Sequence, residues 1–323
     1  MRVTGLFHPW VLAAVACVMP LSASAQMDFE FEETDVAEPD LTPPTPGEPS
    51  ADLTAAIRLY EASKFAEAAM ALQRVVDGET GDDAGNVQKA QFFLAKSLYG
   101  LKFYQSALAI FDEITRASLG HLYFDETLQW LAQLATQLPE PAGITDRIGR
   151  YPLARLETFN TPQTANLYNH LVFLMGRYLY GDGDFETAIE FFQKVQPTSP
   201  FYVEAKFFEG ITHVRLRRAR PAIAAFRTIL ETVDRGKTPI ADKDRIRNLA
   251  WISLARVYYT AANRVDPETG DTDINGQLLG QAVESWNQVD QGSEYWLDAL
   301  FESAWAFFIA NDHSRALGNV HSL

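Results

Sequence analysis

The sequence has a single cysteine among its 323 residues, and this scarcity of thiols narrows what the chain can be. Because Cys17 has no second cysteine to pair with, the chain cannot be held together by its own disulfides. Basic residues are also few, since 27 Lys and Arg stand against 42 Asp and Glu, for a net charge of −15. A general binder of nucleic acid needs the opposite balance, so we expect no nucleic-acid partner.

The sequence also lacks the patterns that catalysis usually requires. Beyond Ala25 there are five histidines, and no two of them have the spacing of a zinc site; they are His121, His170, His213, His313 and His321. There is no phosphate-binding loop and no nucleophile elbow. We therefore predict that the protein is not an enzyme and has no resident cofactor. A hydrolase assembled from scattered residues is the alternative that these patterns favour least.

The N-terminal apolar run, Leu6–Val18, is too short to cross a membrane, because a spanning helix needs roughly 20 apolar residues. The run follows Arg2 and precedes the sequence Ala23-Ser24-Ala25. These features are typical of a secretory signal peptide, residues 1–25, cleaved before Gln26. We therefore predict an exported protein with no transmembrane segment. In a second interpretation, Ala14 to Cys17 forms a lipidation box that leaves the protein anchored through Cys17.

The next segment, residues 26–51, is rich in acidic residues and proline and has no basic residue. It cannot bury enough apolar surface to offset the entropy lost on ordering, so we predict a disordered tail. Helical patterns then fill residues 52–138 and 163–323. Between them, residues 139–162 are less regular, and we predict a joint or a degenerate repeat there.

A 34-residue register organises the second helical region. Small residues and aromatic or aliphatic residues recur in phase in two successive copies: Gly176, Ala188, Phe192 and Val195, then Gly210, Ala222, Phe226 and Ile229. The small residues allow two antiparallel helices to approach closely. This pattern resembles the tetratricopeptide repeat (TPR). The resemblance implies an all-α solenoid of antiparallel hairpins, wound as a right-handed superhelix, whose first helices (A helices) form an inner wall that binds a peptide or protein.

The resemblance also implies which residues bind the partner. They lie in each A helix at spacing i, i+4, i+7, which places them on one face; they are Phe92, Lys96, Tyr99, Phe173, Arg177, Tyr180, Phe207, Arg256, Tyr259, Phe301 and Trp305. Aromatic stripes of this kind are often core. Here, however, Lys96, Arg177 and Arg256 occupy the middle position, and burying a charge without a partner is costly. We therefore predict a solvated groove for a partner with acidic and aromatic groups.

Positive charge is concentrated in residues 203–264, where 13 Lys and Arg oppose six Asp and Glu. Its densest part is a turn between helices that contains Arg215, Arg217, Arg218 and Arg220. Two interpretations stay open for this basic patch. It is either a solvated turn or a dock for carboxylate or phosphate groups.

An insertion at residues 263–280 interrupts the next repeat. Its sequence from Asp271 to Gly276, which includes Asp273 and Asn275, matches the first half of an EF-hand calcium loop. The bidentate glutamate needed at position twelve is replaced by Ala282. A solvated acidic loop is therefore the main interpretation, and a calcium site is the alternative.

The last hairpin begins near Glu294, and Ala316 follows Ala282 in the same register, so we expect an incomplete last repeat. Together these features predict a non-catalytic interaction scaffold in the periplasm, bound to envelope proteins and associated with the outer membrane in one interpretation. The alternative function is a calcium-dependent regulatory or adhesive module built on the inserted loop.

Overall fold

The computed structural model describes residues 42–139, 142–235, 242–265 and 272–322. The predicted signal peptide, Cys17 and residues 26–41 of the predicted tail lie outside them. The chain divides into two compact units, Met1–Ala142 and Gly143–Leu323, and each is described by itself.

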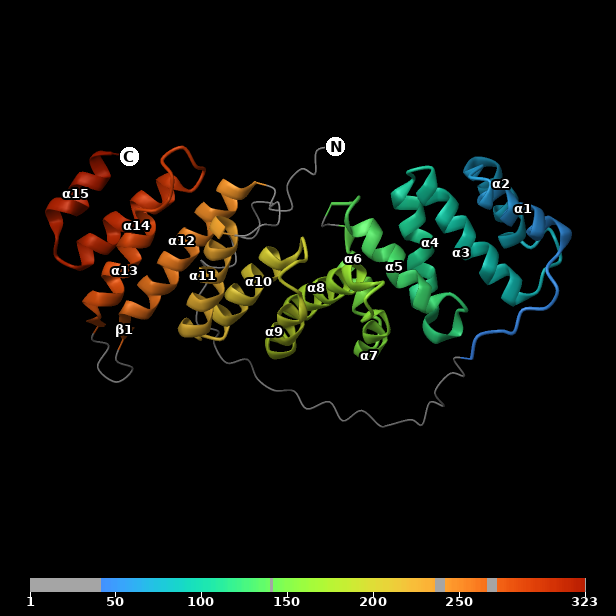
Figure 1. Cartoon of the computed structure of the whole chain (residues 1–323), viewed down its shortest axis with the longest axis horizontal. Helices are drawn as coiled ribbons and strands as arrows, with labels where there is room; N and C mark the ends of the chain where they lie inside the picture. The colour runs from blue at the N-terminus through green and yellow to red at the C-terminus, as the bar shows by residue number, and fades with distance from the viewer. Residues whose placement is uncertain (1–41, 140–141, 236–241, 266–271, 323) are drawn as a thin grey trace, which may run out of the picture. The chain divides into compact units, whose positions relative to one another are not determined.

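The first unit is a stack of helices in which each helix packs mainly against the next (Figure 1). The helices are α1 (Ala51–Glu61), α2 (Phe65–Val76), α3 (Ala84–Gly100), α4 (Tyr104–Ala117), the short η2 (Ser118–Gly120) and α5 (Phe124–Ala135). Four alanines of these helices are fully buried, and their small side chains allow close approach of neighbouring helices; they are Ala56, Ala68, Ala95 and Ala107.

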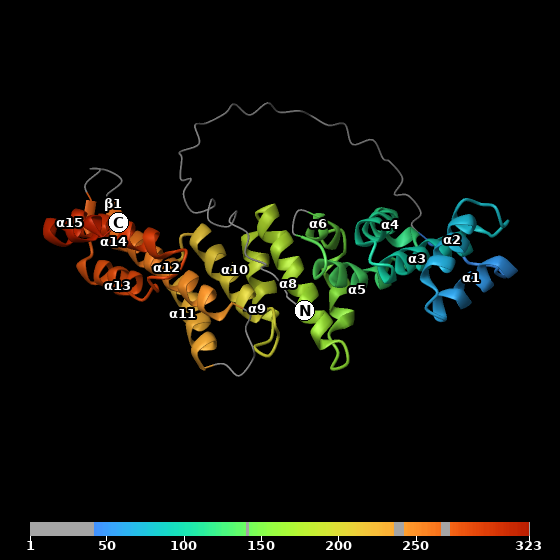
Figure 2. The same cartoon turned by 90° about the horizontal axis from the view of Figure 1, so that it is seen from above.

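The second unit has the same kind of architecture, a stack of paired helices, as Figure 2 shows from above. Three short segments open it: α6 (Ile144–Ile148), α7 (Leu153–Leu156) and η4 (Glu157–Phe159). Hairpins α8 (Ala165–Asp182) with α9 (Phe185–Lys194) and α10 (Tyr202–Arg215) with α11 (Ala219–Arg235) follow. The last two hairpins are α12 (Lys243–Ala262) with α13 (Gly276–Trp286) and α14 (Trp296–Ile309) with α15 (His313–His321).

The 34-residue register has a direct steric cause. A Cβ placed on Gly176 would lie 2.7 Å from the ring of Phe192, and one on Gly210 would lie 2.8 Å from the ring of Phe226. We call the second helix of each hairpin its B helix. The phenylalanine of the B helix therefore fills the space that the missing Cβ of glycine leaves in the A helix of the same hairpin. Phe192 also stacks on Phe208 of the next A helix, with 5.7 Å between ring centroids. The predicted all-α, TPR-like stack of antiparallel hairpins is confirmed.

The predicted disordered tail is wrong in its last residues. The backbone N–H of Gly47 donates to Asp83 Oδ2 at 2.7 Å, and both the N–H and the hydroxyl of Ser50 donate to Asp82. Asn86 Nδ2 in turn donates to the carbonyl oxygen of Gly47. The carboxylates of Asp82 and Asp83, in the connection between α2 and α3, thus accept the hydrogen bonds that hold residues 47–50 in place.

The joint at residues 139–162 is not a complete hairpin. Its described part holds only α6, α7 and η4, and α6 packs against α8. Tyr168 of α8 donates a hydrogen bond to Glu157, and Lys194 of α9 forms an ion pair with the same carboxylate. Residues 143–162 therefore belong to the second unit.

The inserted loop is shorter than the predicted residues 263–280. β1 (Asn263–Val265) pairs antiparallel with β2 (Thr272–Ile274), and α13 begins at Gly276. Asn275 Oδ1 accepts hydrogen bonds from the N–H groups of Gln277 and Leu278, each at 3.1 Å. This N-cap starts the helix earlier than the apolar pattern alone indicated.

Candidate partner-binding surface

Most of the predicted binding residues lie between successive A helices. An aromatic residue occupies the N-cap of three A helices: Tyr123 before α5, Phe201 before α10 and Tyr295 before α14. The residue seven positions later is Trp130, Phe208 or Glu302. These two positions recur as the contact points with the preceding A helix.

The N-cap aromatic covers the first position of the predicted triplet. Phe92 stacks on Tyr123 with 4.5 Å between centroids and 6° between ring planes. Phe173 stacks on Phe201 at 5.7 Å and 18°. Phe92 and Phe173 are therefore 5% and 4% exposed, and Phe207, packed on Phe226, is 5% exposed. Their assignment to a solvated groove is wrong.

The residue seven positions after the N-cap meets the cation in the middle of the triplet. Lys96 Nζ lies 5.6 Å from the ring of Trp130, and Arg177 lies 5.2 Å from the ring of Phe208. At the third place, Arg256 forms an ion pair with Glu302 at 2.6 Å. Each charge thus has a partner in the next A helix, and the prediction that these charges lack partners is wrong.

Lys96 has more ring contacts than the other two cations. Its Nζ also lies 4.6 Å from the ring of Tyr60 and 4.2 Å from that of Phe93. Burial lowers the pKa of Lys96, and burial lowers the pKa of Arg177 to about 10. Because 10 is well above neutral pH, Arg177 stays charged among its rings. Lys96, Arg177 and Arg256 are therefore not available to a partner in the way predicted.

The tyrosines at the third triplet position are half-buried. Tyr99 contacts Trp130, and Tyr180 contacts Phe208, both in the next A helix. Tyr259 instead contacts Trp286 of α13. Tyr99 and Tyr180 therefore complete the contact between A helices, whereas binding of a partner by Tyr259 stays a prediction.

The last A helix is the exception. In α14 the triplet positions hold Phe301, Trp305 and Phe308, and these side chains are 61%, 52% and 52% exposed. Leu297, one turn earlier, is exposed as well. Phe301 and Trp305 are therefore open to solvent, and their binding to a partner stays a prediction.

Helix α15 also carries exposed apolar side chains. Val320 lies four residues after Ala316, the position that Phe111, Phe192 and Phe226 hold in earlier B helices. Those three side chains are fully buried, whereas Val320 and the nearby Leu317 are exposed. We name the set the end face. It holds six of the ten exposed large apolar side chains in the described part of the chain: Leu297, Phe301, Trp305, Phe308, Leu317 and Val320.

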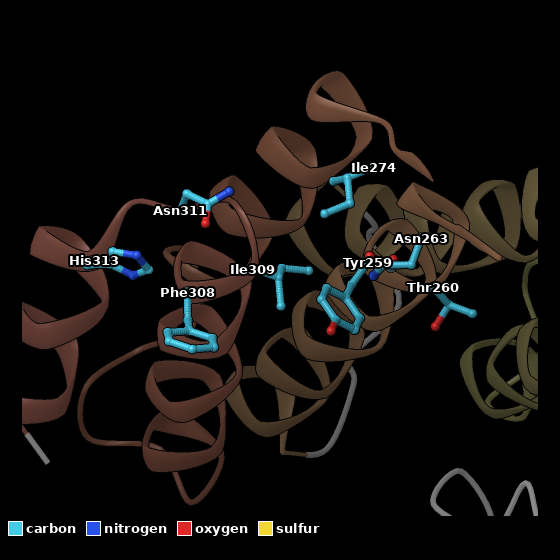
Figure 3. Close-up of a pocket in the computed structure, with 8 residues that line it drawn as sticks. All are labelled: Tyr259, Thr260, Asn263, Ile274, Phe308, Ile309, Asn311 and His313. Atoms are coloured by element: carbon cyan, nitrogen blue, oxygen red, sulfur yellow. The ribbon is translucent and has the colours of Figure 1, made fainter. Parts of the chain in front are cut away.

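A cavity of about 570 Å³ adjoins the end face (Figure 3). In Figure 3, Ile309 lies between Phe308 and Tyr259, with His313 beyond Phe308. The Phe308 ring stacks on Trp305 and contacts His313, each with 5.5 Å between centroids. The amides of Asn263 and Asn311 also line the cavity. It is largely open to solvent and combines aromatic walls with polar groups.

The basic patch lies in the turn between α10 and α11, and all four of its arginines have exposed or partly exposed side chains. Arg218 forms a two-pronged ion pair with Glu186 of α9, with N to O distances of 2.8 and 2.6 Å. Arg215 Nε donates a long hydrogen bond of 3.4 Å to the Tyr180 hydroxyl. Arg217 has a positive φ in the turn, and Arg220 lies in the first turn of α11. Anion binding by this patch stays a prediction.

Of the three predicted calcium ligands, the structure describes the side chain of Asn275 alone. Asp271 and the side chain of Asp273 lie outside the described residues, and Asn275 uses its side-chain oxygen to cap α13. Within the described ranges, no three His, Cys, Asp or Glu side chains are grouped as metal ligands. Calcium binding stays a prediction.

Among the helices that the structure describes, none is long and apolar enough to cross a membrane.

No protein-family model matches the sequence, and no curated protein matches it. Similar solved structures include the C-terminal part of a TPR repeat-containing protein from Cytophaga hutchinsonii, at 18% identity and a TM-score of 0.45, covering 84% of this chain and 95% of that one. A tetratricopeptide repeat protein from Parabacteroides merdae has 15% identity and a TM-score of 0.37, covering 84% and 90%. A thermophilic TPR protein from Thermus thermophilus has 14% identity and a TM-score of 0.29, covering 80% and 97%.

The fold assignment stands on the chain's own geometry. The hairpins, the 34-residue register and the contacts of Gly176 with Phe192 and of Gly210 with Phe226 define a TPR-like fold. Stacks of this kind typically serve protein–protein interaction.

Proposed function

We propose that the protein is a non-catalytic interaction scaffold of the cell envelope and that its partner docks on the end face. The observation that carries the proposal is the exposure of Phe301, Trp305 and Phe308, whose counterparts in earlier A helices are covered. Contiguous apolar surface of this kind usually marks an interaction site. Aromatic side chains also contribute more to binding energy than most other residues.

The cavity beside the end face supports the same proposal. Tyr259 and Phe308 supply apolar walls, while Asn311 and His313 supply groups that can form hydrogen bonds. A partner on the end face would therefore reach both apolar surface and polar groups that fix its orientation.

Binding is tested by comparing two double variants of the full chain in co-purification from an envelope extract. Phe301→Ser with Trp305→Ser removes the centre of the end face, and Phe103→Ser with Met70→Ser removes exposed apolar side chains of the first unit. We expect the first variant to lose a partner that the wild type and the second variant retain. Equal recovery by all three proteins would contradict the proposal, provided that circular dichroism shows the same helicity.

The proposed location is supported by the sequence of Met1–Ala25, which has the features of a signal peptide. Fractionation of cells, with mass spectrometry of the purified protein, tests it. We expect a periplasmic protein that begins at Gln26. A lipidated N-terminus at Cys17 would support the anchored alternative, and an intact Met1 in the cytoplasm would refute export.

A further inference from the structure

The contacts of α3 with α5 and of α8 with α10 share one pattern. An incoming A helix places an aromatic N-cap on the first triplet position of the preceding A helix, as Tyr123 does on Phe92. Seven residues later it places a complement against the middle position, as Phe208 does against Arg177. Where the middle residue is a cation, the complement is an aromatic ring or, for Arg256, the carboxylate of Glu302.

The end face presents the same two positions with different chemistry. Phe301 is an aromatic first position like Phe92 and Phe173, so it suits the same aromatic N-cap. The middle position is Trp305 instead of a cation. Because the ring is now on the chain's side of the contact, a cation–π pair there requires the cation on the incoming helix.

The surrounding charge favours the same complement. Between Glu294 and Ser322 the chain has four acidic residues, Glu294, Asp298, Glu302 and Asp312, and one basic residue, Arg315. Asp298 lies one turn before Phe301 and Trp305 lies one turn after it, and the Asp298 side chain is 57% exposed. Glu294, Glu302 and Asp312 are ion-paired with Arg245, Arg256 and Arg315. Asp298, 3.8 Å from Arg256 and more than half exposed, is therefore the carboxylate that a cation on the incoming helix can reach.

From these contacts we propose that the end face binds an amphipathic helix of a partner protein, with an aromatic N-cap residue that stacks on Phe301 and a Lys or Arg seven residues later that lies over Trp305. This inference rests on the proposed function, because it specifies the partner of the same surface. The first helix of a second copy does not fit it. Helix α1 has Ser50 at its N-cap and Ile57 seven residues later.

The test uses a peptide taken from the chain itself. Residues 121–137 contain α5, with Tyr123 at the N-cap and Trp130 seven residues later. Fluorescently labelled peptides with Trp130→Lys or Trp130→Glu are titrated with the full chain, and binding is followed by fluorescence anisotropy. We expect the Lys peptide to bind at least about fivefold more tightly than the Glu peptide, because only the Lys peptide can form the cation–π pair.

Variants of the peptide and of the chain test whether the peptide binds at Phe301 and Trp305. Tyr123→Ser in the Lys peptide, or Trp305→Ser in the chain, should weaken binding about tenfold, since each removes a buried aromatic contact. Phe103→Ser in the chain is the matched control and should leave affinity unchanged. No binding of the Lys peptide, equal affinity of the Lys and Glu peptides, or equal loss in the Phe103 control would overturn the inference.

Analytical sedimentation of the chain alone tests whether a second copy of the chain, rather than a partner helix, covers the end face. A dimer that Trp305→Ser dissociates would show that a second copy covers the end face, and would overturn the proposal of a partner helix. If co-purification depends on the end face while the Lys peptide does not bind, the proposed function stands and only this description of the partner fails.

Discussion

Arg256 and Glu302 form an ion pair that fastens α12 to α14, with Arg256 Nη2 2.6 Å from Glu302 Oε1. The other carboxylate oxygen accepts a hydrogen bond from Trp286 Nε1 of α13 at 2.9 Å. The Arg256 and Glu302 side chains are only 23% and 26% exposed. One carboxylate therefore joins three consecutive helices, and Arg256 stabilises the fold.

Replacing Arg256 with alanine should lower the free energy of unfolding by about 2 kcal/mol, because it leaves the Glu302 carboxylate without its charged partner. Chemical denaturation of Arg256→Ala, Glu302→Gln and the double variant measures the coupling between the two residues. The exposed pair Arg218 and Glu186 is the control, and we expect no measurable coupling there. Equal coupling in both pairs would contradict the structural role of Arg256.

Gly176 gives a second prediction. Substituting alanine in a helix normally stabilises it by roughly 1 kcal/mol, but a Cβ at Gly176 meets the Phe192 ring at 2.7 Å. We expect Gly176→Ala to destabilise the protein by about 1 to 3 kcal/mol through overpacking. Gly280 in α13 has open space around its Cβ position and serves as the control, so Gly280→Ala should raise stability. We therefore expect the melting temperature to fall for Gly176→Ala and to rise for Gly280→Ala. A shift of both in the same direction would contradict the steric explanation.

His170 makes stability depend on pH. Its ring stacks on Phe201 at 4.0 Å, and burial lowers the pKa of His170 to about 4 from the ordinary 6.5. Between those values the unfolded chain binds the proton and the folded chain does not, so stability falls as the pH drops from 6.5 to 4. The loss due to this residue is about 3 kcal/mol.

Denaturation curves at pH 7 and pH 4.5 check this expectation. His170→Phe should keep the aromatic stack and remove the share of the pH dependence that is due to this residue. His121, whose pKa burial also lowers to about 4, keeps its own share. His321→Gln, at an exposed position, should behave like the wild type. A His170→Phe protein whose acid sensitivity matches that of the wild type would show that other groups control it.

The sequence predicted the hairpins because their signal is local and repeated. Gly176, Ala188 and Phe192 recur in the same register in the next hairpin, and the cause of that spacing is contact within one hairpin. The end of the predicted tail was placed wrongly because it depends on groups that are distant in the sequence. Gly47 is held by Asp83, 36 residues away, which composition alone could not indicate.

The meaning of the aromatic and basic triplets could not be predicted from their spacing alone. Periodicity places Phe92 and Lys96 on one face of α3, but it does not say what covers that face. The signal that was missed is the recurrence of an aromatic N-cap with a partner seven residues later, as in Tyr123 and Trp130. Together, the triplets and these N-cap pairs predict an interface between A helices.

The most direct test of the proposed end face is photo-crosslinking in the native cell. A photoreactive phenylalanine derivative replaces Trp305 in one variant and Phe103 in another, both at exposed positions. We predict a crosslink to a distinct second protein from position 305 and none from position 103. If position 305 forms no crosslink, or the same crosslinks as position 103, the end face is not the surface through which this protein binds its partner.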